Sequence, residues 1–151
     1  MAEWKSRVGQ LALLLAATIF SGCPVSVVTA PQLNASPAAT DFGTTQTTRD
    51  LALENTGGGT LEWTAQEVTR ADVDSPWVAA DIPWLTLSIN AGSITTDLDH
   101  ITLTASRSGL SSGLYTNTGV QISGNGGTVT VPVSLTVEAQ LQVTPKTLAL
   151  S

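Results

Sequence analysis

The stretch that decides the fold is Thr128-Val129-Thr130-Val131-Pro132-Val133-Ser134-Leu135-Thr136-Val137. Its odd-numbered positions are all aliphatic, whereas its even-numbered positions carry hydroxyl groups apart from Pro132. Such period-two alternation is typical of a β-strand with one buried face and one solvated face. Because Pro132 has no N–H group, we expect this strand to have a free edge or a bulge at that point.

A shorter alternation precedes this strand. Val120 and Ile122 alternate with polar or small residues, and Gly124-Asn125-Gly126-Gly127 supplies residues that tolerate positive φ. The two stretches therefore predict a β-hairpin with a four-residue loop. The same period predicts further strands at about residues 32–35, 47–54, 60–66, 84–89 and 99–105, which brings the total to about seven.

Seven short strands within residues 31–138, with turn signals between them, predict an all-β fold, an immunoglobulin-like antiparallel β-sandwich. Composition agrees, because Thr and Ser are abundant while Lys is rare, and Thr favours strands where Ser favours turns.

Charge and cysteine usage exclude several classes of protein. Six basic against 12 acidic residues give a net charge of −6, and the chain has one Cys and one His. Nucleic-acid binding is disfavoured because phosphates require a basic surface. Neither a disulfide framework nor a Cys/His zinc site can be built, so we expect no metal and no cofactor.

Residues 1–22 have the plan of a secretory signal peptide, with Lys5 and Arg7 before an apolar run from Leu11 to Phe20. As a helix this run would rise only about 15 Å, roughly half the thickness of a bilayer core, so a permanent anchor is not expected.

Cys23, which directly follows Ser21 and Gly22, resembles the lipobox cysteine of bacterial lipoproteins, although that motif prefers Leu, Val or Ile where this chain has Phe20. The resemblance implies that Cys23 becomes the first mature residue and carries lipid, with residues 23–30 as a tether. The protein would then be extracytoplasmic and bound to a membrane. The alternative is ordinary signal cleavage after Ala30, which Pro31 disfavours.

Residues 139–151 align with residues 31–43 at a constant offset of 108, matching Gln140 with Gln32 and Pro145 with Pro37. This offset equals the length of the sandwich. We therefore expect the last segment to be the first strand of a truncated second repeat, or else a disordered tail in which the similarity arose by chance.

Four ordered motifs, at residues 55–63, 83–87, 107–115 and 126–127, resemble the BACON family. The resemblance covers residues 31–138 and implies an extracytoplasmic immunoglobulin-like module, often tandem and often joined to hydrolases, for which carbohydrate or mucin binding has been inferred from that company. From the residues themselves, Gly113 and Tyr115 suggest a corner in which the Tyr115 hydroxyl bonds to backbone.

Three tryptophans follow the signal segment. The strand periodicity predicts a buried Trp63, and Trp84 is also expected in the core. Trp77 lies in a long polar connection, where it either anchors the loop on the sandwich edge or forms, with Asp74 and Asp81, a platform for sugar rings.

No catalytic set is evident. The sole His100 has no nucleophile elbow near it, and the carboxylate pairs Asp72/Asp74 and Asp97/Asp99 fit solvated turns better than calcium ligands. We expect a non-enzymatic, monomeric module serving as a spacer or adhesion domain at the cell envelope, with the membrane and glycans or envelope proteins as partners. The alternative is a carbohydrate-binding module that serves an enzyme outside this chain.

Overall fold

The computed structural model describes residues 29–139. The predicted signal peptide, Cys23, most of the tether and the predicted second repeat after Ala139 lie outside the described residues. Within 29–139 every regular element is a strand, and no helix there is long and apolar enough to span a bilayer. The ten strands are β1 Leu33–Ser36, β2 Thr40–Asp41, β3 Thr48–Asn55, β4 Leu61–Thr69, β5 Val78–Ala79, β6 Leu85–Leu87, β7 Ala91–Ile94, β8 Asp99–Ala105, β9 Gly113–Gly124 and β10 Gly127–Val137.

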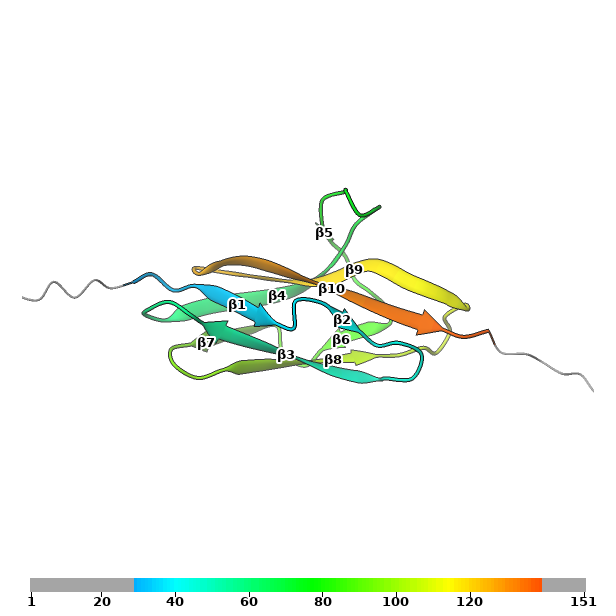
Figure 1. Cartoon of the computed structure of the whole chain (residues 1–151), viewed down its shortest axis with the longest axis horizontal. Coiled ribbons are helices and arrows are strands. Elements are labelled where there is room, and N and C mark those ends of the chain that lie inside the picture. Colours follow the sequence, from blue (N-terminus) through cyan, green and yellow to red (C-terminus); the bar gives the residue numbers. More distant parts are fainter. Residues whose placement is uncertain (1–28, 140–151) are drawn as a thin grey trace, which may run out of the picture.

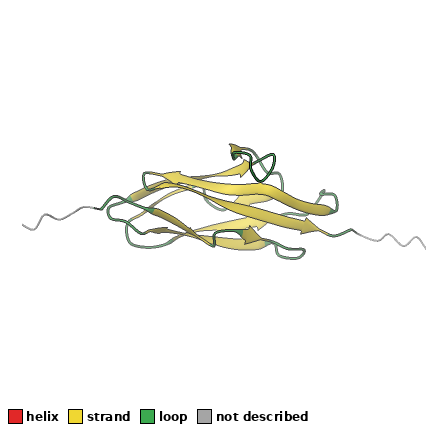
Figure 2. Cartoon of the chain, turned by 45° about the horizontal axis from the view of Figure 1, so that its top comes forward, coloured by secondary structure: helices red, strands yellow, loops and turns green. Residues whose placement is uncertain are grey.

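Two sheets pack face to face as a sandwich (Figures 1 and 2). One sheet has the order β1-β3-β8-β6, and the other has the order β2-β10-β9-β4-β5, with β7 also paired to β4. All pairs are antiparallel except β2 with β10, which is parallel. This pair departs from the purely antiparallel arrangement that the alternation predicts.

Alternating side chains from both sheets fill the core. Trp63 is only 2% exposed and Trp84 only 6%, so both are core residues as predicted. The Trp63 indole donates a hydrogen bond of 2.8 Å from Nε1 to Asp99 Oδ2, which joins β4 to β8 across the two sheets. A buried indole N–H needs such a partner. Trp84 packs edge-on against Phe42 and Tyr115.

The predicted hairpin is confirmed as β9–β10, but its turn is tighter than expected. Gly124 pairs with Gly127, so only Asn125 and Gly126 lie between the strands. Asn125 stabilises this turn by accepting the Glu62 N–H and donating to the Thr60 carbonyl.

Pro132 lies at an edge, as predicted. Phe42 N–H donates to the Ser134 carbonyl and Thr136 N–H donates to the Gly43 carbonyl, so even-numbered residues of β10 point their backbone groups away from β9. The missing N–H of Pro132 is therefore on the outer side, where β2 pairs over only two residues. The register with β9 also shifts between Val133 and Leu135.

Strands β2, β5 and β7 were not predicted, because none of these segments carries two apolar residues at alternate positions with polar residues between them. The strand expected over 84–89 is shorter, at Leu85–Leu87, and Ile89 is 41% exposed instead of facing the core with Leu85. The chain leaves β6 after Leu87 to reach β7.

The described chain enters and leaves the sandwich at opposite ends of its long axis (Figure 1). At the entry end, the Gly58 N–H donates to the Ala30 carbonyl, which holds the segment before β1 against the β3–β4 turn. Asn55 closes this turn, since its Oδ1 accepts the N–H groups of Gln32 and Gly57.

Candidate functional site

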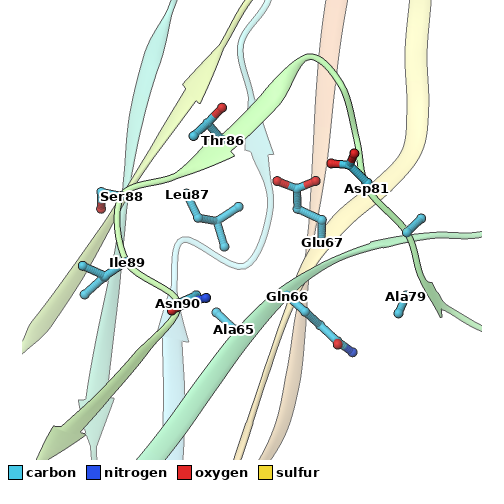
Figure 3. Close-up of a pocket in the computed structure, with 11 residues that line it drawn as sticks. Ala65, Gln66, Glu67, Ala79, Asp81, Thr86, Leu87, Ser88, Ile89 and Asn90 are labelled. Carbon is cyan, nitrogen blue, oxygen red and sulfur yellow. The ribbon is translucent and has the colours of Figure 1, made fainter.

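A groove of about 810 Å³ opens along the outer edge of β4 (Figure 3). This edge is covered by β7 over Leu61–Thr64 and by β5 over Val68–Thr69, which leaves a gap between the two short strands. At the margins of the gap, Ala65 N–H donates to Asn90 and the Glu67 carbonyl accepts from Ala80. The groove is therefore a place where the sheet edge lacks a neighbouring strand.

Glu67 is one of two carboxylate side chains in the groove. It is half-buried, and its Oε2 accepts the Ile82 N–H at 2.6 Å. Burial raises the pKa of Glu67 above its ordinary value; the Ile82 hydrogen bond opposes this, and the nearby negative charge of Asp81 adds to it. Figure 3 shows the two carboxylates together at one end of the groove.

The rest of the lining mixes amides, hydroxyls and aliphatic groups, contributed by Gln66, Thr86, Leu87, Ser88, Ile89 and Asn90. These groups accept and donate hydrogen bonds but include no nucleophile paired with a base. Within residues 29–139 no three His, Cys, Asp or Glu side chains gather as metal ligands. The groove offers carboxylates, amides and hydroxyls that can bind a polar ligand.

A second, smaller cavity of about 340 Å³ shares Ala80 and Asp81 with the groove. Its walls are mostly apolar and include Trp84, Tyr115 and Leu110. The Tyr115 hydroxyl donates to the Ser111 carbonyl at 3.0 Å, which confirms the predicted corner.

Trp77 is half-buried, outside both cavities. The Arg70 guanidinium lies 4.4 Å from the centre of its ring, a cation–π contact. A Cβ built on Gly119 would approach the ring at 3.3 Å, so the absence of a side chain at Gly119 makes room for the indole on β9. Asp74 is exposed in the same connection. Asp81 lines both the groove and the smaller cavity, and in the smaller cavity it lies with Trp84 and Tyr115.

Of the other candidate carboxylates, Asp72 and Asp99 accept hydrogen bonds within the fold. Asp72 Oδ1 accepts the Asp74 N–H, and hydrogen bonds from the Ser75 side chain and the Asp74 amide lower the pKa of Asp72. Asp99 accepts the Trp63 indole, and Asp97 is exposed. His100 is exposed on β8, opposite Ala52 of β3.

Sequence reasoning missed Glu67, although a signal was present. Leu61, Trp63 and Ala65 share the inward parity of β4, and continuing that parity by one step reaches Glu67. A carboxylate at an inward position of a strand indicates a partly buried charge, which is worth inspecting as a site.

No family model and no curated protein matches the chain. Solved structures do match its fold. A chain in the CsuC–CsuE chaperone–tip adhesion subunit pre-assembly complex from the archaic Csu pili of Acinetobacter baumannii has a TM-score of 0.60 and 10% identity, covering 71% of this chain and 52% of that one. The periplasmic chaperone SfaE has a TM-score of 0.52 and 9% identity, covering 75% and 60%. PapD-like domain 7 of human CEP192 has a TM-score of 0.51 and 16% identity, covering 74% and 89%.

The described chain is an immunoglobulin-like β-sandwich, and its fold is similar to that of PapD-like domains. It spans about half the length of the Csu chain that it matches. At these identities the likeness concerns the fold alone.

Proposed function

We propose that this protein is a non-catalytic, immunoglobulin-like module of the bacterial cell envelope, anchored by lipid on Cys23 and acting as a spacer or adhesion domain. The observation that carries the proposal is the placement of the chain ends. Because the described chain enters at one end of the long axis and leaves at the other (Figure 1), the sandwich adds its full length between whatever precedes it and whatever follows it.

The anchor part of the proposal rests on residues 1–23. Removal of residues 1–22 leaves Cys23 as the first mature residue, and multiple acyl chains hold a protein on a membrane durably. Residues 23–30 then tether the sandwich to an extracytoplasmic membrane face. The periplasmic chaperone SfaE, which has a similar fold, supports such a location.

Metabolic labelling tests the anchor. The full chain, expressed in a bacterium fed radioactive palmitate, should take up label and sediment with membranes. Cys23→Ser should remain unlabelled, and Cys23→Ala should behave in the same way as Cys23→Ser. Label that persists in both variants, or a wild-type chain that stays unlabelled and cytosolic, would refute anchoring.

The adhesion part rests on the connection between β4 and β5, which projects from the sandwich in Figure 1. Val73 in this connection is 69% exposed, and Val78, the first residue of β5, is 53% exposed; the half-buried Trp77 lies between them in sequence. Apolar side chains displayed on a projecting loop are a means of contacting a partner protein.

Carbohydrate binding is the second candidate function. The groove offers carboxylate and amide groups for sugar hydroxyls, and Asp81 joins it to a cavity with aromatic walls. Trp77 with Asp74 and Asp81 remains the predicted platform. Titration of glycans while monitoring tryptophan fluorescence tests it: binding should shift the spectrum, Trp77→Ala and Asp81→Asn should weaken the shift, and His100→Ala should not. Unchanged spectra across mucin and plant polysaccharides would remove this function.

Membership of the BACON family and the second repeat are proposals of the same kind. If residues 139–151 begin another copy, a chain ending at Ala139 should melt at the same temperature as the full chain. A drop of several degrees would instead place that segment in the core of the first domain.

A further inference from the structure

The parallel pair of β2 and β10 joins the first and last parts of the sandwich at its exit end. Thr40 and Asp41 pair with Val133 and Ser134. Just beyond the pair, Phe42 N–H donates to the Ser134 carbonyl at 2.9 Å and Thr136 N–H donates to the Gly43 carbonyl at 2.9 Å. Backbone pairing and hydrogen bonds thus hold the segment Thr40–Gly43 against β10 along its whole length.

Side chains reinforce this contact. The Ser134 hydroxyl donates to Asp41 Oδ1 at 2.8 Å, and the Gly43 N–H donates to the same carboxylate oxygen at 2.9 Å. These two hydrogen bonds, the Gly43 bond being the larger, hold the pKa of Asp41 below its ordinary value. Phe42 is fully buried and packs edge-on against Trp84, with 6.5 Å between ring centres.

Arg107, in the loop after β8, adds hydrogen bonds to both sides of this contact. Its guanidinium donates to four backbone carbonyls, those of Gln46 at 2.7 Å, Gly43 at 2.8 Å, Phe42 at 3.2 Å and Thr136 at 3.2 Å. One side chain therefore binds the β2–β3 connection and β10 together. We call Arg107, Asp41, Ser134 and the segment Thr40–Gly43 the terminal clamp.

The directions of the strands determine whether tension between the chain ends shears or unzips the terminal clamp. In Figure 1, β1 and β10 both run from the entry end toward the exit end. Tension between the two ends therefore pulls β2 and β10 in opposite directions along their common axis. In such a shear geometry the hydrogen bonds of the pair are stretched together, whereas unzipping stretches them one at a time.

We propose that the terminal clamp carries mechanical tension and makes this sandwich resistant to force applied between its entry and exit ends. The inference deepens the proposed spacer function, since it assigns to the spacer a mechanical task at the envelope. It does not depend on the lipid itself, because any tether before β1 applies the same load. The forced unfolding rate, not the equilibrium stability, is the quantity concerned.

Single-molecule force spectroscopy on one chain in two geometries tests the proposal. The full chain, made in the cytosol so that Cys23 keeps its thiol, is held through Cys23 and through a handle after Ser151, which loads the terminal clamp in shear. In the second geometry it is held through Cys23 and through Thr60→Cys. Thr60 lies beside the Gly58–Ala30 contact at the entry end, so β1 is peeled away.

Because both geometries start from the same folded state, a higher unfolding force in the first geometry supports the terminal clamp. Equal forces, or a lower force in the first geometry, would overturn it. A failure of palmitate labelling at Cys23 would leave this comparison unaffected, so the two proposals fail separately.

Variants sharpen the test. Arg107→Met should speed unfolding at a fixed force about tenfold in the shear geometry, the effect of losing roughly one charge-assisted hydrogen bond from the barrier, and less than about twofold in the peeling geometry. Asn125→Ala is the matched control, since it also removes side-chain bonds to backbone but at the β9–β10 turn. If Asn125→Ala speeds shear unfolding as much as Arg107→Met, the proposal is wrong. Ser134→Ala provides a milder clamp variant should Arg107→Met fail to fold, and must lower the shear force.

Discussion

Arg107→Met is the substitution whose consequences the structure defines best. Methionine keeps most of the aliphatic stem and removes the guanidinium, so the change isolates the four hydrogen bonds to backbone. Two of the four acceptors keep another donor: the Phe42 carbonyl retains the Gln46 N–H at 3.1 Å, and the Gly43 carbonyl retains the Thr136 N–H at 2.9 Å.

The carbonyls of Gln46 and Thr136 lose the donor that Arg107 supplies. An acceptor left without a partner away from water costs about 1–3 kcal/mol. The Thr136 carbonyl is half-buried, whereas the Gln46 carbonyl is exposed and can bind water instead, so we predict a loss of about 2 kcal/mol in the free energy of unfolding. For a domain of this size, each kcal/mol corresponds to a fall in Tm of roughly 4 °C, which predicts a decrease of about 8 °C.

Urea denaturation followed by tryptophan fluorescence measures this free energy, and calorimetry measures the Tm. Arg107→Lys is the control, because it keeps the charge and loses the planar fork that reaches several carbonyls at once. We expect Lys to recover less than half of the loss. A loss below about 1 kcal/mol for Met, or full recovery by Lys, would refute the reasoning from fork geometry.

Three further predictions concern single contacts. Glu67→Gln should raise the urea midpoint at pH 7 and not at pH 4, because burial raises the pKa of Glu67 in the folded protein. The contribution of Glu67 to stability is complete below the ordinary value of 4.5 and is lost as pH rises through the folded pKa, so a midpoint that is unchanged at pH 7 would contradict this reasoning. Tyr115→Phe should lower the free energy of unfolding by about 1 kcal/mol, because the hydrogen bond to the Ser111 carbonyl is lost; urea denaturation measures this, and equal stability would show that the bond does not stabilise the fold. Gly92→Ala should cost about 2 kcal/mol, because its Cβ would lie 2.6 Å from both the Trp63 ring and Asp99; calorimetry and the near-UV circular dichroism of Trp63 check this, and an unaltered spectrum would count against it.

Periodicity predicted the long strands because their buried faces are uninterrupted. In β10 the aliphatic side chains at odd positions face the core, so the pattern is complete over ten residues. The short strands escaped because they are defined by their neighbours: β5 exists only where Val68 and Thr69 provide backbone partners. The parallel pairing of β2 with β10 depends on the same long-range contact, which local sequence does not encode.

The candidate site divides in the same way. Asp81 was singled out from sequence and does line the groove and the smaller cavity, but Glu67 and Tyr115 reach these sites from two segments that are distant in the sequence. Trp84 directly precedes Leu85 and would face the opposite side in a regular strand, yet both are buried, because Trp84 lies before the start of β6. Arg107 stood within a recognised motif, yet its role depends on backbone carbonyls, which carry no sequence signal.

The outer faces of the sheets explain why binding features gather at the edge and in one loop. Across β4, β9 and β10, Gln66 donates to Gln121 at 3.1 Å and Gln121 donates to Thr130 at 3.4 Å. On the other sheet, Thr102 donates to Asp50 at 2.8 Å. Polar groups that satisfy one another across strands have less to gain from a ligand, since binding would exchange one set of hydrogen bonds for another. The edge of β4 differs because its gap has no neighbouring strand, and the β4–β5 connection differs because it displays apolar side chains to solvent. A spacer requires sheet faces whose polar groups satisfy one another. An adhesive spacer requires, in addition, only one surface that can bind a partner, such as the β4 edge or the β4–β5 connection.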